Sequence, residues 1–436
     1  MKLRLEDLYS HLKRLIACNS SNSKGMRLEN PTSPILLIGG PGAGKTTALK
    51  ELKEKSDLNV VFTSTTNAAA QALGGVTIHS FLSLPIEIDK DTRDLTLQKI
   101  STSILEYYMS NTLSPRVKLF PSGDTLNTLN TNDAPLFIFI DEAFILNSDT
   151  LELIHEAVEL TNKRLIAHDL GWVQLILCGD PAQLLAISGN RFYHASFLSS
   201  PNQTIFRLEG LYRQKGFGSL WNEAIHSYRT KGCDEGLIEW IQTLHSKGTN
   251  ILKSKIDFSP SLDNFTIAFT NKMVNGINLQ ILLNHVKVKG VPLHQMHDSL
   301  WLAEGCPFII TQNDKSLGLY KRDRGIISKI EPDDNPNVLL LHLLMSNKEK
   351  KITIPHHVGT KDLPLSLGWA GTIHTSQGGT YPNIQVLLSH HMKNTPGAAL
   401  VSLTRHVKSL SLIGMNISDL SLVLQQGTDP LALSFL

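Results

Sequence analysis

The sequence predicts an α/β protein that contains two mostly parallel β-sheets covered by helices. Short apolar runs alternate with segments of helical periodicity, and this order is typical of doubly wound sheets. The runs form two series that meet near residue 203. The chain has 436 residues, of which 41% are hydrophobic and 18% charged, and this is enough for two to four globular domains.

The first series follows an amphipathic helix expected over residues 3–16 and a polar linker over residues 19–33. Its expected strands are Ile35–Ile38, Asn59–Thr63, Phe137–Ile140 and Gln174–Cys178. Residues 82–133 break the pattern with Ser, Thr, Asn, Pro and charged residues, so we expect an inserted subdomain there. Residues 1–81 and 134–203 then form the first domain.

The second series begins after about Gln203. Its expected strands are Thr266–Thr270, Pro307–Thr311, Ala370–Ile373, Ile384–Leu388, Ala399–Leu403 and Ser411–Ile413. Alternating apolar residues and turn signals over residues 325–361 predict a small β-rich insert. Residues 204–324 and 362–436 then form the second domain.

The composition narrows the cellular setting. The net charge of +2 does not by itself argue for nucleic acid, so a basic surface would need local clustering. No C-x-x-C pair occurs among Cys18, Cys178, Cys233 and Cys306, which argues against a zinc site and a disulfide framework. No apolar run is long enough to span a membrane, and Glu6 and Asp7 stand where a signal peptide needs apolar residues. We therefore expect an intracellular protein, cytoplasmic or nuclear, with no membrane partner.

The most informative segment reads Gly39-Gly40-Pro41-Gly42-Ala43-Gly44-Lys45-Thr46 and fits the pattern G-x-x-x-x-G-K-[ST]. Such a loop lies between a strand and a helix and binds nucleotide phosphates on backbone N–H groups at the helix N-terminus. The expected nucleotide-binding residues are Gly40, Gly42, Ala43, Gly44, Lys45, Thr46 and Thr47. Lys45 would reach the β- and γ-phosphates of ATP, and the Thr46 hydroxyl would hold Mg²⁺.

Two further strand ends carry polar residues suited to hydrolysis. Asp141 and Glu142 follow the apolar run Ile138–Ile140, at the edge where α/β sheets bind ligands. Asp141 would hold the metal, and Glu142 would orient and deprotonate the attacking water. Gln183 follows the next expected strand and would sense the γ-phosphate or position that water.

Two arginines are candidates for stabilising the charge that develops on the γ-phosphate. They are Arg213, in the segment Leu208–Gln214, and Arg405, in the segment Leu400–His406. An arginine delivered to this position contributes on the order of 10³ to 10⁵ in rate. If both arginines come from the second α/β domain, ATP binding would draw the two domains together and hydrolysis would release them.

Further segments occur in a fixed order along most of the chain. They are Thr63–Ala70, Gly75–Phe81, Gly171–Asp180, Phe269–Asn271 with Asn278, and Pro364–Thr380. In this order they resemble motif Ia, the T-I-H-S-F element, the approach to motif III, motif IV and the PIF-type motif V of the superfamily 1 helicases. The resemblance is to type B, the group that includes RecD, phage Dda and the PIF (petite integration frequency) DNA helicases.

The resemblance implies two RecA-like domains, 1A and 2A, with a pin-type insert 1B over residues 82–133 and an SH3-like insert 2B over residues 325–361. It implies an ATP-dependent helicase that moves 5′ to 3′ on single-stranded DNA and unwinds duplex at single-strand/duplex junctions. Candidate strand contacts are Thr66, His79, Phe81, His374 and Ser376, and Gly378 of motif V would contact nucleotide. Candidate pin residues are Tyr107, Tyr108 and Phe120. We expect a monomer that works with replication or recombination proteins.

Departures from the family pattern leave alternatives open. Family members usually place a glutamine ahead of the P-loop to read adenine, but the first glutamine here is Gln71, so use of other triphosphates is an alternative. Tyr212 is the candidate residue to stack on the base. The segment Thr404-Arg405-His406 resembles the T-R-H of helicases in plus-strand RNA virus replicases, which favours an RNA helicase or NTPase as a second hypothesis and a viral or mobile-element origin. A third hypothesis is a P-loop switch that binds nucleic acid without unwinding it.

Overall fold

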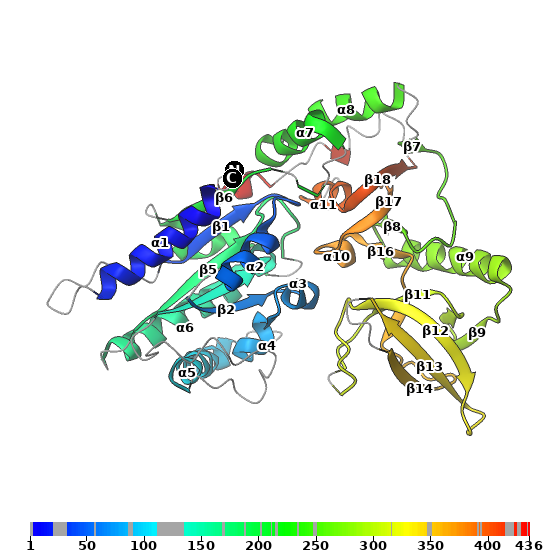
Figure 1. Ribbon diagram of the computed structural model, residues 1–436, viewed down its shortest axis with the longest axis horizontal. Coiled ribbons are helices and arrows are strands. Elements are labelled where there is room, and N and C mark those ends of the chain that lie inside the picture. The colour runs from blue at the N-terminus through cyan, green and yellow to red at the C-terminus, as the bar shows by residue number, and fades with distance from the viewer. Residues whose placement is uncertain are drawn as a thin grey trace. The chain divides into compact units, whose positions relative to one another are not determined.

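A computed structural model gives the fold of the chain, and Figure 1 shows its elements. The residues it describes are 3–20, 33–55, 58–85, 90–110, 135–167, 171–186, 189–200, 203–210, 212–213, 217–232, 235–246, 251–314, 316–346, 351–389, 392, 395–414, 423–424, 429–433 and 435–436. They divide into two compact units: unit 1 is Met1–Arg213 with Asp429–Leu436, and unit 2 is Gln214–Thr428. The predicted α/β class, with two parallel sheets, is confirmed.

The sheet of unit 1 has six strands, all parallel, in the order β3-β2-β4-β5-β1-β6. The strands are β1 (Ile35–Gly39), β2 (Asn59–Ser64), β3 (Val76–Thr77), β4 (Leu136–Asp141), β5 (Val173–Gly179) and β6 (Ile205–Leu208). The four predicted strands are the central ones, which are buried on both faces and therefore read as continuous apolar runs. The edge strands β3 and β6 were not predicted.

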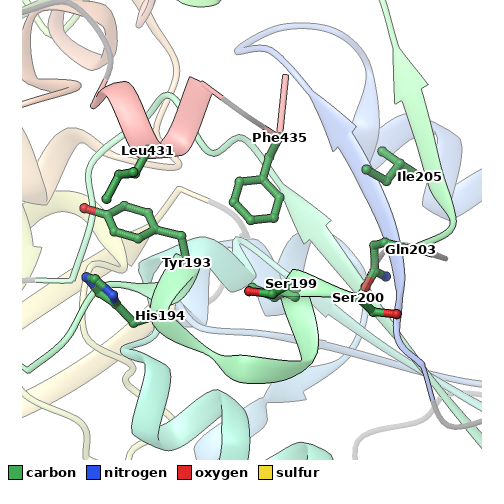
Figure 2. A pocket seen from close by; sticks show the side chains of 9 residues that line it. Tyr193, His194, Ser199, Ser200, Gln203, Ile205, Leu431 and Phe435 are labelled. Carbon is green, nitrogen blue, oxygen red and sulfur yellow. The ribbon is translucent and has the colours of Figure 1, made fainter.

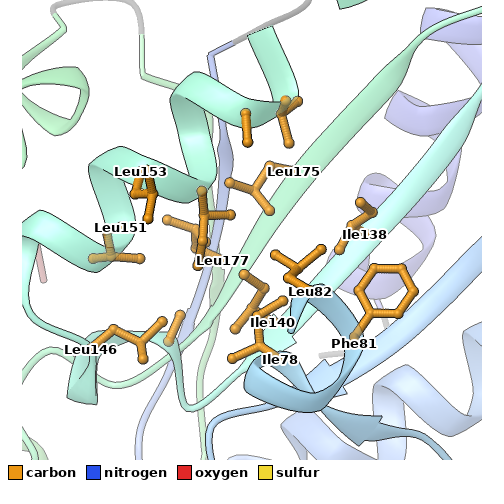
Figure 3. Packing of buried hydrophobic residues seen from close by; sticks show 14 of the residues in the cluster. Ile78, Phe81, Leu82, Ile138, Ile140, Leu146, Leu151, Leu153, Leu175 and Leu177 are labelled. Carbon is orange, nitrogen blue, oxygen red and sulfur yellow. The ribbon is translucent and has the colours of Figure 1, made fainter. Parts of the chain in front are cut away.

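Successive side chains of these strands pack on opposite faces of the sheet. On one face, Leu37 and Phe139 join helices α1 (Leu3–Ser20) and α2 (Lys45–Lys55) in one core. On the other face the core contains α4 (Ile78–Leu82), α5 (Arg93–Ser110) and α6 (Ser148–Ala167), and Figure 3 shows Ile138, Ile140, Leu175 and Leu177 packed there. Within the insert expected over residues 82–133, helix α5 therefore packs on the first core, against α6.

The C-terminal residues return to unit 1. Helix α13 (Pro430–Leu433) places Ala432 in the core. The Phe435 ring packs edge-on against the Phe192 ring, with the two ring centroids 5.4 Å apart. Asp429 forms an ion pair with Arg191. The expected division assigned residues 204–213 and 429–436 to the second domain, whereas here they group with unit 1 because β6 pairs with β1 and the C-terminal residues pack on the first core.

A cavity of about 520 Å³ lies beside this C-terminal segment, as Figure 2 shows. Its lining mixes aromatic, aliphatic and hydroxyl side chains: Tyr193, His194, Leu198, Ser199, Ser200, Gln203, Ile205, Leu431 and Phe435. None of the predicted site residues lines it.

Unit 2 contains a second parallel sheet, in the order β16-β8-β17-β18-β7. The strands are β7 (Leu252–Lys253), β8 (Asn264–Ala268), β16 (Ala370–Thr372), β17 (Tyr381–Leu387) and β18 (His406–Ile413). The described residues of this unit include the helices α7 (Gly218–Lys231), α8 (Glu235–Ser246), α9 (Asn271–Lys289), α10 (Ile373–Ser376) and α11 (Ala398–Leu403). The strand expected at Ala399–Leu403 was wrong, since α11 is a helix whose six residues are all buried, and periodicity cannot separate a short buried helix from a buried strand.

The other described strands of unit 2 are antiparallel. A five-stranded sheet has the order β14-β13-β12-β11-β15, with β11 (Pro307–Ile310), β12 (Arg324–Pro332), β13 (Val338–Met345), β14 (Lys351–His357) and β15 (Leu365–Leu367). A hairpin of β9 (His294–His297) and β10 (Leu300–Leu302) lies before it in the chain. The β-rich segment expected over residues 325–361 contains β12 to β14, and the sheet adds one strand on each side of it in sequence. Within the residues described above, no helix is long and apolar enough to cross a membrane.

Candidate nucleotide and nucleic-acid sites

Three neighbouring strands of unit 1 end at the same edge of the sheet. The order β4-β5-β1 places the ends of these strands side by side, with Ile140 opposite Leu177 and Ile38 opposite Gly179. Because parallel α/β sheets bind ligands beyond the carboxyl ends of their strands, this edge is the candidate nucleotide site. It brings together the phosphate loop after β1, the acidic pair at the end of β4 and the turn after β5.

The phosphate loop adopts a backbone conformation that requires its glycines. Gly42 and Gly44 have φ values of 78° and 85°, a left-handed region that favours glycine, and the Ala43 amide donates to the Gly40 carbonyl at 3.1 Å. Lys45 is the first residue of α2 and is 8% exposed. Its Nζ donates to the carbonyl oxygens of Gly39 at 2.6 Å and Gly40 at 3.2 Å, so the ammonium group lies within the loop. Of the adjacent threonines, Thr46 is half-buried and Thr47 is exposed.

The acidic pair is held by its own backbone. Asp141 is buried at the end of β4, and its Oδ1 accepts a hydrogen bond of 2.9 Å from the Glu142 amide. Burial, together with the nearby Glu142 charge, raises the pKa of Asp141 to about 7, although Lys45 opposes this shift. Carboxylate and hydroxyl oxygens are the kind of donor that Mg²⁺ takes, so the side-chain chemistry of Asp141 and Thr46 suits this metal, and their role as its ligands stays a prediction.

The turn after β5 holds Gln183 in place. Gln183 is 3% exposed, and its Nε2 donates to Asp180 Oδ2 at 3.4 Å. Asp180 Oδ1 also accepts from the Ala182 amide at 3.2 Å. Asp180 was not among the predicted site residues. The signal that marked Asp141, an aspartate at the end of an apolar strand, also marks Asp180 and could have found it.

Arg213 lies in unit 1, with the phosphate loop, and not in the second unit as expected. The preceding residue explains its position, because the Tyr212 amide donates to the Gly42 carbonyl at 2.8 Å. The Tyr212 side chain is 47% exposed, and its ring passes 3.6 Å from where a Cβ on Gly44 would lie. Tyr212 therefore lies beside the phosphate loop. Its stacking on the base of a bound nucleotide stays a prediction.

The other predicted nucleotide residues lie in unit 2. Arg405 follows α11 and is 2% exposed; its Nε donates to the Val401 carbonyl at 3.0 Å. Gly378 follows α10 with a φ of 80°. The contacts of Arg405 and Gly378 with nucleotide stay predictions.

The strand contacts implied by the resemblance occupy short helices in both units. Thr66 caps helix α3 (Asn67–Ala72), and its side-chain oxygen accepts from the Ala69 amide at 3.3 Å. His79 is half-buried in α4, and burial lowers its pKa. His374 is half-buried in α10; burial, and then the charge of Arg322, lower its pKa. Both imidazoles are therefore disposed to be neutral and to act as hydrogen-bonding groups.

Two of the predicted strand contacts lie at buried positions, and their contact with a strand stays a prediction. Phe81 is 7% exposed, and its ring packs edge-on against that of Tyr107 in the first core, with the ring centroids 5.4 Å apart. Ser376 is fully buried, and its hydroxyl donates to the Ile373 carbonyl at 2.7 Å. Among the pin candidates, Tyr107 and Tyr108 pack with the first core, which disfavours both as wedges, and Phe120 lies outside the described residues.

A sequence family described as the AAA domain matches residues 27–248, just over half of the chain. The chain belongs to this family. The match contains the phosphate loop, the acidic pair, Gln183 and Arg213, which are the unit 1 residues of the candidate nucleotide site.

Three curated relatives with similar sequences are named as ATP-dependent DNA helicases. The chain is 26% identical to the ATP-dependent DNA helicase Pif1 of Bdellovibrio bacteriovorus over 88% of this chain and 84% of that protein. It is 22% identical to the ATP-dependent DNA helicase Pif1 of a Psychrobacter species over 91% of this chain and 67% of that protein. The match to the ATP-dependent DNA helicase PIF4 of Trypanosoma brucei brucei, 26% identical over 40% of this chain, spans only 19% of that larger protein. The resemblance to the PIF group of type B helicases is thus confirmed.

Solved structures agree on the fold. The Pif1 helicase of Candida albicans superposes with a TM-score of 0.62 at 18% identity, over 94% of this chain and 98% of that one. Bacteroides Pif1 bound to single-stranded DNA superposes with a TM-score of 0.58 at 20% identity, over 90% of this chain and 94% of that one. At these identities the likeness establishes the fold alone.

Proposed function

We propose that the chain is an ATP-dependent DNA helicase that moves 5′ to 3′ on single-stranded DNA and unwinds duplex. One observation carries this proposal: Lys45, Asp141 and Gln183 stand at the ends of three adjacent parallel strands, within a chain whose motifs follow the order of the PIF helicases. The curated relatives that match most of the chain are described as ATP-dependent DNA helicases. One of the structures that share the fold holds ADP-AlF3 and single-stranded DNA.

Each residue of the site has a proposed role in hydrolysis. Lys45 and the loop amides bind the β- and γ-phosphates, and Glu142 takes a proton from the attacking water. Gln183, fixed by Asp180, positions this water. Thr46 and Asp141 would hold Mg²⁺, which when bound would neutralise charge on the phosphoryl group.

Arg213 and Arg405 are proposed to stabilise the charge that develops on the γ-phosphate. Arg213 belongs to the unit that holds the phosphate loop, whereas Arg405 belongs to unit 2. Both guanidinium groups would bind phosphate oxygens with several donors at once. If Arg405 engages only when ATP is bound, hydrolysis would release unit 2, and this cycle would move the chain along a strand.

Strand binding is proposed to use Thr66, His79 and His374. Hydroxyl, imidazole and backbone N–H groups are suited to phosphate oxygens and read no sequence, which a translocating enzyme requires. Because phosphate contacts dominate such binding, affinity for the strand should fall steeply with salt. We further propose that the chain acts inside the cell as a monomer, together with replication or recombination proteins.

An RNA helicase or NTPase is a second candidate, favoured by the segment Thr404-Arg405-His406. The test is unwinding of forked DNA and forked RNA duplexes with either a 5′ or a 3′ single-stranded tail. The proposal predicts ATP-dependent unwinding of 5′-tailed DNA. A preference for RNA would support the second candidate, and strand binding without stimulated ATP hydrolysis would support a non-unwinding switch.

A further inference from the structure

The segment that carries Thr66 is hydrogen-bonded to the backbone of the acidic pair. Strand β2 pairs with β4 so that Ser64 lies opposite Asp141. The Thr65 amide donates to the Asp141 carbonyl at 3.1 Å, and the Ser64 hydroxyl donates to the same carbonyl at 3.1 Å. One residue further on, the Thr65 hydroxyl donates to the carbonyl of Glu142 at 3.2 Å. The strand-binding segment and the proposed catalytic base therefore share a direct contact.

Glu142 has a backbone that depends on such contacts. Its φ of 54° and ψ of 34° lie in the left-handed region, which is strained for a residue other than glycine. Its amide is held by Asp141 Oδ1, and its carbonyl accepts from both the Thr65 hydroxyl and the Ile145 amide, the latter at 3.3 Å. A change at Thr65 would alter the orientation of this peptide and thereby the direction in which the Glu142 carboxylate points.

Hydrogen bonds also join Thr66 to Ser64 and to helix α3. The Thr66 amide donates to the Ser64 hydroxyl at 3.3 Å, and the Thr66 side chain caps α3. At the other end of α3, Lys53 Nζ donates to the carbonyls of Leu73 and Gly74 at 3.3 Å and 3.5 Å. Lys53 lies on α2, the helix that begins with Lys45. Helix α3 is thus held at one end by the acidic pair and at the other by the phosphate-loop helix.

We infer that Thr65 is a positioning residue that transmits strand contact at Thr66 to the catalytic orientation of Glu142. Phosphate binding at Thr66 would pull on the α3 cap, and the Thr65 hydroxyl would pass this displacement to the Glu142 peptide. In this way a bound strand would accelerate hydrolysis. The inference rests on the proposed function, because it assumes that Thr66 contacts a strand and that Glu142 acts as the base.

The test compares three variants of the full chain. Thr65→Val keeps the β-branched shape and removes the donor, whereas Thr65→Ser keeps the hydroxyl. Thr63→Val is the matched control, since the Thr63 hydroxyl donates at 2.7 Å to the carbonyl of Phe139, on the same pair of strands but away from the acidic pair. ATP turnover is measured with and without a saturating oligodeoxythymidine, and binding of the oligonucleotide is measured by fluorescence anisotropy.

We expect Thr65→Val to lower the stimulation of kcat by the strand by roughly tenfold, the effect of losing one hydrogen bond, while the affinity for the strand stays within about twofold. Thr65→Ser and Thr63→Val should retain the stimulation. If Thr65→Val does not fold, Thr65→Ala provides the same comparison. If the variants without a Thr65 hydroxyl retain the stimulation, the inference about Thr65 is overturned and the proposed function is unaffected. A wild-type chain whose ATP turnover no strand stimulates would contradict the proposed function as well.

Discussion

The backbone amide of Tyr212 donates a hydrogen bond of 2.8 Å to the carbonyl oxygen of Gly42. This bond ties the segment after β6 to the phosphate loop and places the next residue, Arg213, in the same unit as the loop. The hypothesis that both arginines come from the second unit therefore holds for Arg405 alone. The role proposed for Arg213 at the phosphates would therefore be supplied by unit 1 itself.

Arg213→Ala should lower kcat by about 10²-fold or more, because an arginine on the γ-phosphate acts mainly on the transition state. ATP affinity should change less, since the loop amides and Lys45 remain. The measurement is steady-state ATP turnover with a saturating strand. Arg207→Ala is the control, because this arginine on β6 donates to the Leu436 carbonyl at 2.9 Å and has no proposed role in the chemistry. Similar kcat values for both variants would remove Arg213 from the site.

Arg405→Ala should also lower kcat by at least about 10²-fold at saturating ATP. Arg405 is buried, so its loss could act through folding. Ser402→Ala controls for this, because the buried Ser402 hydroxyl donates to the Ala398 carbonyl at 2.8 Å within the same helix and its replacement leaves the charge in place. We expect Ser402→Ala to keep kcat within about threefold. An equal loss in both variants would make Arg405 a structural residue.

Phe435→Ala should destabilise unit 1 by about 2 kcal/mol, less than a fully buried Phe→Ala because the ring is half-buried against Phe192. Leu431→Ala, on the same C-terminal segment but 57% exposed, should cost less than about 0.5 kcal/mol. The free energy of unfolding in urea checks both values. Equal effects would mean that the C-terminal segment does not stabilise unit 1 through its core contacts.

His79 should make the stability of unit 1 depend on pH. Its pKa in the folded chain is lowered by burial below the ordinary value of 6.5. The unfolded chain therefore binds the proton first as the pH falls, and the free energy of unfolding decreases as the pH falls below about 6.5, until the folded-state pKa is passed.

In His79→Gln this decrease should be smaller between about pH 7.5 and about pH 5.5. Urea unfolding at the two pH values measures it, with His226→Gln, at an exposed position of α7, as the control. The same pH dependence in wild type and His79→Gln would show that His79 makes no contribution.

The sequence indicated the centre of the first sheet because of how these strands are buried. Strands β1, β2, β4 and β5 read as apolar runs, and the glycine pattern after β1 located the phosphate loop. The edge strand β6 gives a weaker signal, since it is short and half-buried and contains Arg207. The same ambiguity of short buried runs explains why α11 was expected to be a strand.

Contacts that depend on register could not be predicted. The bond from Thr65 to Glu142 exists because β2 pairs with β4 in one register, which places Ser64 opposite Asp141. The C-terminal residues contact a part of unit 1 that is distant in the sequence, and no local sequence pattern predicts this contact. The burial of Phe81 and Ser376 likewise follows from packing, which their position in the motifs does not reveal.

Directional movement on a strand is the most direct test of the central claim. Single-stranded DNA carrying biotin at its 3′ or its 5′ end is loaded with streptavidin and incubated with the chain and ATP, with Glu142→Gln as the control. A motor that moves 5′ to 3′ should displace streptavidin from the 3′ end and leave the 5′ end occupied, and the variant should displace neither. ATP hydrolysis in the presence of the strand, with streptavidin retained at both ends, would contradict the account.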